Sequence, residues 1–195
     1  MKTVLTLGAA GAVLFAATAF AAGPATDEVV QRDVNQQQRI EQGLQSGQLS
    51  TKEAGKLEHE EAQIERTEAR DLKNGKLSPA EQAQINRMQN KASTDIYRDK
   101  HNGVTGNPNS ASSQRMQADV QRNVNQQQRI EQGAKSGTLT NRETGKLERG
   151  QAHVDAKEAA AARNGHVSAA EQSSIQKSEN HQSQRIYRKK HNQPS

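Results

Sequence analysis

The stretch "SGQLSTKE", residues 46–53, recurs in altered form at three other places and decides how this chain folds. The other copies are "NGKLSPAE" (74–81), "SGTLTNRE" (136–143) and "NGHVSAAE" (164–171). In each copy a Ser or Thr stands three positions before a Glu, which is the capping box that begins a helix. The Gly ahead of the box suits the left-handed residue that ends a preceding helix. The motif therefore predicts four sharp turns between helices.

A calcium loop is the alternative explanation, because Gly, Leu and Glu match positions six, eight and twelve of an EF-hand. Such a loop also needs oxygen ligands at positions one, three and five. In the first copy these positions hold Gln42, Leu44 and Ser46, and none of the four copies has a carboxylate there. We therefore expect helix junctions at these turns, and no calcium.

The second half of the chain repeats the first. Residues 32–102 align without a gap to residues 122–192, at an offset of 90 positions (122 − 32). "RDVNQQQRIEQG" returns as "RNVNQQQRIEQG", and "IYRDKHN" returns as "IYRKKHN". This pattern predicts an all-α protein of two tandem homologous three-helix units, each running up-down-up. The units are residues 27–102 and 115–192, joined by a flexible Gly-, Asn- and Ser-rich linker at 103–114.

The predicted helices of the first unit cover residues 27–45, 51–73 and 79–101. Their apolar residues recur at helical spacing in a narrow stripe, so the core must be thin and made of aliphatic side chains. Gly55 and Gly145 interrupt the second helix of each unit. Close helix approach would explain a glycine there in both units, and so would their shared ancestry. The sequence leaves open whether the units pack together, and a lean core makes a homodimer plausible.

The first 21 residues predict a secretory signal peptide. Lys2 precedes an apolar run, and Ala19-Phe20-Ala21 offers the small-x-small pattern of a cleavage site. The chain has no cysteine, so neither a lipid attachment site nor a disulfide is expected. These features predict a periplasmic or secreted protein without membrane insertion.

Charge is distributed unevenly between the halves. Residues 27–102 carry 12 Lys and Arg against 14 Asp and Glu, a net charge of −2, whereas residues 115–195 carry 14 against 8, a net charge of +6. The most basic cluster is Arg185, Arg188, Lys189 and Lys190, which makes the second unit a candidate polyanion-binding module. The alternative is that this basic cluster is an ordinary solvated helix face without a partner. Nucleic acid is not an expected partner, because stacking aromatic residues are absent and the protein is predicted to be exported.

Two of the six histidines, His101 and His191, occupy equivalent positions in the two units. Transition-metal binding (Cu, Ni or Zn) through this pair would require the units to meet. The alternative is that both histidines close the third helix of their unit, where positive charge suits the helix dipole. No other cofactor is expected.

Catalysis has little support, because the sequence lacks a cysteine nucleophile, a Gly-x-Ser-x-Gly elbow, a phosphate-binding loop and a His-Glu-x-x-His motif. The carboxylates are spread along helix faces, as expected of solubilising pairs.

Together, "NQQQRIEQG", "GKLE", "IYRxKHN" and the turn motifs resemble a group of uncharacterised exported helical proteins of Gram-negative bacteria. The resemblance implies a periplasmic helical protein and assigns no site residues. The expected function is therefore non-enzymatic, either binding or structural, in envelope maintenance or stress, with a protein or envelope component as partner.

Overall fold

The computed structural model describes residues 24–192, and the predicted signal peptide lies outside them. These residues form an all-helical bundle without strands, which confirms the all-α fold class. The elements are α1 (Pro24–Ser46), α2 (Thr51–Asp71), the short 3-10 helix η1 (Leu72–Asn74), α3 (Pro79–Lys100), α4 (Ala111–Lys135), α5 (Asn141–Ala162) and α6 (Ala169–His191). None of the helices within 24–192 is long and apolar enough to cross a membrane.

Capping boxes begin four of the helices, as the repeated motif predicts. Ser50, Ser78, Thr140 and Ser168 each accept a hydrogen bond from the backbone N–H of the Glu three positions on, whose carboxylate accepts the cap residue's N–H in return. The glycines ahead of these caps have φ between 73° and 88°, the left-handed region. The turn motif therefore has a structural role at all four places.

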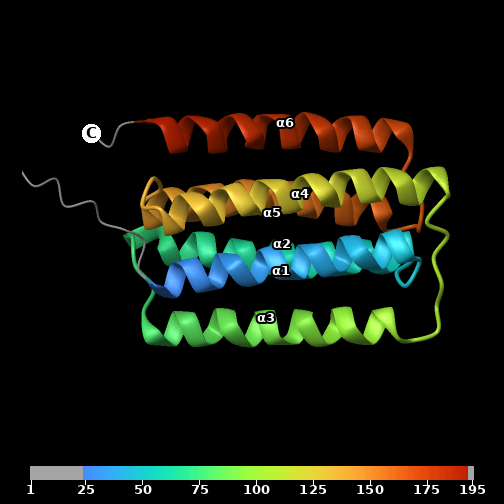
Figure 1. The fold of residues 1–195 in the computed structure, drawn as a ribbon, viewed down its shortest axis with the longest axis horizontal. Coiled ribbons are helices and arrows are strands. Elements are labelled where there is room, and N and C mark those ends of the chain that lie inside the picture. Colours follow the sequence, from blue (N-terminus) through green and yellow to red (C-terminus); the bar gives the residue numbers. More distant parts are fainter. Residues whose placement is uncertain (1–23, 193–195) are drawn as a thin grey trace, which may run out of the picture.

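Four helices form the centre of the bundle and two flank it. In Figure 1, α1 and α2 lie beside α4 and α5, while α3 and α6 cover opposite faces of this central group. The most extensive contacts join α2 to α5 and α1 to α4, so the two halves of the chain pack together along their length.

Glycine makes the close contact between α2 and α5 possible. A Cβ atom added to Gly55 would lie 2.5 Å from Cβ of Ala162, and one added to Gly145 would lie 2.8 Å from Cβ of Leu72. Each contact joins the start of one helix to the end of the other, so α2 and α5 are antiparallel. The close helix approach that would explain both glycines occurs between the halves of the chain.

Apolar side chains gather mainly towards the ends of the central bundle. One cluster contains Ile40, Leu57, Met116 and Val154, and a second contains Val30, Ile130 and Leu147. All of the core residues are aliphatic, as predicted. A third cluster joins Ile64 of α2 to Val29 and Ile85. Beside these apolar residues, the middle segments of α2 and α5 also bury polar side chains.

The connection between the halves is held against the bundle. The backbone N–H of Gly106 donates to the carbonyl oxygen of Gly47 at 2.8 Å. Helix α4 begins at Ala111, inside the segment predicted to be linker, because Ser110 caps it and Met116 is buried in the core. The Ser-rich composition that indicates a linker thus supplies a helix cap.

Candidate metal centre

Eight acidic side chains lie buried in the middle of the bundle, and we call them the carboxylate layer. Each has at most 1% of its surface exposed. One comes from α1, four from α2 and three from α5. They are Asp33, Glu58, Glu61, Glu65, Glu68, Glu148, Asp155 and Glu158. The expectation that the carboxylates are solvated pairs on helix faces is wrong for these residues, because the two halves of the chain bury them between α2 and α5.

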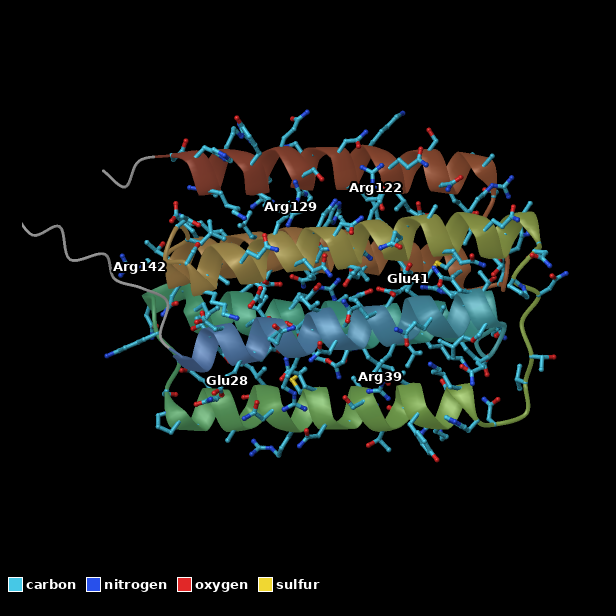
Figure 2. All side chains as sticks on the ribbon, viewed as in Figure 1. Glu28, Arg39, Glu41, Arg122, Arg129 and Arg142 are labelled. Carbon is cyan, nitrogen blue, oxygen red and sulfur yellow. The ribbon has the colours of Figure 1, made fainter. Side chains whose placement is uncertain are left out.

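Basic side chains do not neutralise this layer. Within residues 24–192, no ion pair involves any of its eight members. Arginines enter the bundle farther out, where Figure 2 shows Arg39 between α1 and α3, and Arg122 and Arg129 between α4 and α6. Arg122 pairs there with Glu179 at 3.0 Å. The negative charge of the layer must therefore be balanced by protons or by bound cations.

Burial and mutual repulsion favour the protonated form of these groups. Loss of hydration raises the pKa of Asp33 and of Glu58 to about 7, and that of Glu148 to about 8. Burial, and then the neighbouring carboxylates, raise the pKa of the other five well above the usual value. At neutral pH the layer consequently holds protons that a cation could displace.

Two groups of three carboxylates have the spacing of cation ligands. The Asp33 set consists of Asp33, Glu68 and Glu148, and the Asp155 set of Glu58, Asp155 and Glu158. Within each set, one oxygen atom from every member lies within 4.8 Å of the others. Two oxygens bound to one calcium ion at about 2.4 Å are no more than about 4.8 Å apart, so the spacing fits such an ion.

Buried amides surround both sets. Gln37 Nε2 donates to Glu58 at 2.9 Å and to Asp155 at 3.4 Å, while Gln127 Nε2 donates to Glu65 at 2.6 Å and to Glu148 at 3.0 Å. The Oε1 atoms of both glutamines are buried and have no hydrogen-bond partner among the described residues. These amides therefore bring further oxygen atoms into the layer.

Glu61 belongs to neither set, and its carboxyl group is also buried without a hydrogen-bond donor. Both of its carboxylate oxygens are buried, and neither has a hydrogen-bond partner within residues 24–192. Its pKa is raised by burial first and then by Asp33, Glu58 and Asp155, which places it beside both sets. An isolated buried carboxylate is costly unless it is protonated or coordinates a metal.

The arrangement can bind a hard cation. No protein-family model matches the chain, and the comparisons with curated proteins and with solved structures also find no match. The chemistry of the site must therefore be argued from its geometry alone.

The predicted histidine pair lies away from this layer, and its members are far from each other in the fold. His101 follows α3 and His191 ends α6, and Figure 1 shows these two helix ends on opposite faces and at opposite ends of the bundle. Each ring stacks on a tyrosine, Tyr97 or Tyr187, with centroids 4.3 and 4.1 Å apart. Each Nδ1 donates to that tyrosine's carbonyl oxygen. One ion could therefore contact both histidines only between two molecules.

The predicted basic cluster lies along the last turns of α6, and three of its members bind within the protein. Arg185 Nη2 donates to the Lys146 carbonyl at 2.8 Å, and Lys190 Nζ donates to the Arg129 carbonyl at 3.1 Å. Lys189 lies 3.4 Å from the Glu143 carboxylate. Arg188 lines a shallow surface hollow beside Tyr187. These contacts tie α6 to the central helices.

The carboxylate layer corresponds to a pattern in the sequence of α2 and α5. Glu58, Glu61, Glu65 and Glu68 follow one another at spacings of three, four and three, which places them on one face of α2. The aligned residues of α5 are Glu148, Gln151, Asp155 and Glu158. Three of these four positions stay acidic at the offset of 90, and the fourth becomes an amide.

Proposed function

We propose that this chain is an exported, non-enzymatic protein that binds a hard cation in its core. The observation that carries the proposal is the carboxylate layer, eight buried acidic groups without an ion pair to any described basic side chain. Two tandem homologous units, each of three helices, supply the ligands from both sides. Cation binding would consequently hold the units together.

The donor atoms favour calcium or an ion of similar size and hardness. Every candidate ligand is a carboxylate or amide oxygen, which suits hard cations, whereas copper, nickel and zinc favour the nitrogen and sulfur donors that the layer lacks. Magnesium usually keeps several of its waters and demands octahedral geometry. An enclosed site with ligands from α1, α2 and α5 suits the more flexible coordination of calcium.

The location follows from the predicted signal peptide at residues 1–21 and from the resemblance to exported helical proteins. In the periplasm or outside the cell, free calcium is expected to be far more abundant than in the cytosol. A protein of this composition could store the ion there or use it to stabilise its own fold. The envelope role expected from the sequence fits either use.

Thermal unfolding followed by circular dichroism tests the proposal. The purified protein is stripped with EDTA at pH 7.5 and melted with calcium, magnesium, manganese or zinc added in turn. A cation at about 100 times its Kd stabilises the folded state by about 2.7 kcal/mol, which corresponds to a rise in Tm of about 5–10 °C. The largest rise is expected with calcium. A Tm that none of the four metals changes would refute the proposal.

Glu68→Gln and Glu28→Gln form a matched pair of variants for this assay. Glu68 is buried in the layer, whereas Glu28 is exposed near the start of α1, as Figure 2 shows. Glu68→Gln should abolish the calcium response, and Glu28→Gln should keep it. The double variant His101→Ala/His191→Ala tests the transition-metal alternative, because loss of the response only in that variant would place the ion at the histidines.

A further inference from the structure

The two ligand sets are related by the repeat but differ in how many oxygens they leave free. At the offset of 90, Glu68 aligns with Glu158 and Glu58 with Glu148, so a carboxylate is retained at both pairs. The third members of the sets do not correspond. Asp33 of α1 aligns with Asn123 of α4, and Asp155 aligns with Glu65, which belongs to neither set. The second half of the chain has thus exchanged one acidic ligand for an amide.

Asn123 occupies ligand atoms of the Asp155 set. Its Nδ2 donates to both carboxylate oxygens of Glu158, at 3.0 and 2.9 Å. Glu68, the aligned residue, accepts no hydrogen bond from an amide or a basic side chain among the described residues, and its carboxyl group faces that of Asp33, with which it can share a proton. The exchange of Asp for Asn therefore removes a charge and also supplies a donor that competes with a cation.

Gln151 fixes Asn123 in this orientation. Gln151 Nε2 donates to Asn123 Oδ1 at 2.9 Å, so the oxygen of that amide faces Gln151 and its nitrogen faces Glu158. Gln151 aligns with Glu61, the second position at which a carboxylate of the first half becomes an amide. The two exchanges act together, because an acid at position 151 could not donate this hydrogen bond when ionised.

The two sets therefore differ in the number of carboxylate oxygens that are free to bind a cation. In the Asp33 set, four oxygens accept no hydrogen bond from an amide, hydroxyl or basic side chain among residues 24–192: Asp33 Oδ2, both oxygens of Glu68 and Glu148 Oε1. In the Asp155 set this holds only for Glu58 Oε1, because Gln37, Gln151 and Asn123 donate to the others. Four such carboxylate oxygens supply at least half of the coordination of a calcium ion, which takes six to eight ligands.

We infer that Asp33, Glu68 and Glu148 form the one tight cation site of the described residues, and that Asn123 prevents tight binding at the Asp155 set by donating to its carboxylate. This inference rests on the proposed function. The wild-type protein should then bind one calcium ion tightly. The Asp155 set, satisfied by amide donors, serves as a hydrogen-bonded support on the other side of the layer.

Isothermal titration with calcium at pH 7.5 tests this inference by gain of function. Asn123→Asp restores the missing ligand and should raise the tight stoichiometry from one to two ions per chain. Asp33→Asn copies the second set into the first and should weaken the tight site at least about tenfold, since even changes outside the ligand shell cost about 10- to 100-fold. Both substitutions are nearly isosteric, and circular dichroism establishes that each variant is folded.

The outcomes separate this inference from the proposal that it rests on. Two equal tight sites in the wild type, or one ion in folded Asn123→Asp, would overturn the inference and leave cation binding intact. A wild-type protein that binds no calcium, by titration or by thermal shift, would overturn cation binding itself. One ion in the wild type, two in Asn123→Asp and none bound tightly by Asp33→Asn would establish the assignment.

Discussion

The metal-free protein should lose stability as the pH rises from 5 to 8, because its core binds protons more strongly than the unfolded chain does. Asp33 and Glu58 have pKa values raised to about 7, and Glu148 to about 8, against ordinary values of 3.8 for Asp and 4.5 for Glu. Above the ordinary values the unfolded chain releases these protons while the folded protein keeps them. Stability therefore falls with pH until the folded-state values are passed.

The size of the effect follows from the number of groups. Each carboxylate that is protonated in the folded state and ionised in the unfolded state lowers the free energy of unfolding by about 1.4 kcal/mol per pH unit. Asp33, Glu58 and Glu148 alone give a slope of about 4 kcal/mol per unit between pH 5.5 and 7, and the other five groups of the layer act in the same direction. Since a domain is stable by only about 5–15 kcal/mol, the metal-free protein should be close to unfolding at pH 8.

The capping glutamates act in the opposite direction at lower pH. Hydrogen bonds from their cap residues lower the pKa values of Glu81, Glu143 and Glu171, and hydrogen bonds from Asn102 and then from its cap, Ser50, lower the pKa of Glu53. Their contribution is present above the ordinary value and is lost as the pH falls through the folded-state values. The stability of the metal-free protein should therefore peak near pH 5.

Urea unfolding of the EDTA-treated protein at intervals from pH 4 to 8 measures this profile. Calcium should remove most of the decline above pH 6, because a bound ion replaces the protons as the balancing charge. Glu148→Gln should be less pH-sensitive and more stable at pH 8 than the wild type. A metal-free protein whose stability is constant or increases from pH 5 to 8 would contradict the assignment of protons to the layer.

Three further substitutions probe the structure around the layer. Gly55→Ala should destabilise the fold by about 1–3 kcal/mol, because the new Cβ would meet Ala162, and adding Ala162→Gly should restore much of the loss in thermal melts. Ser78→Ala removes a cap and should cost about 1 kcal/mol in urea unfolding, whereas a loss near zero would mean that this capping box is dispensable. Arg122→Met leaves the buried Glu179 without its ion pair and should lower the free energy of unfolding by about 1–3 kcal/mol at pH 9. The loss should be smaller at pH 5, because Glu179 is then protonated.

The helices and turns of this protein are determined locally, which is why the sequence predicts them. A Ser or Thr three residues before a Glu, following a Gly, satisfies the free backbone groups at a helix junction wherever the junction lies. The narrow apolar stripe likewise predicts a thin aliphatic core. The beginning of α4 is the exception, because its Ser-rich start resembles a linker until the burial of Met116 shows that it packs.

The carboxylate layer depends on contacts that a single helix cannot reveal. Taken alone, Glu58, Glu61, Glu65 and Glu68 form an acidic helix face that water would solvate, and α5 carries an equivalent face. The antiparallel contact through Gly55 and Gly145 turns both faces inward and removes their water. The sequence by itself thus determined the helices, the turns and the repeat. Only the packing of one half against the other decided which charges are buried, because burial is a property of the assembled bundle.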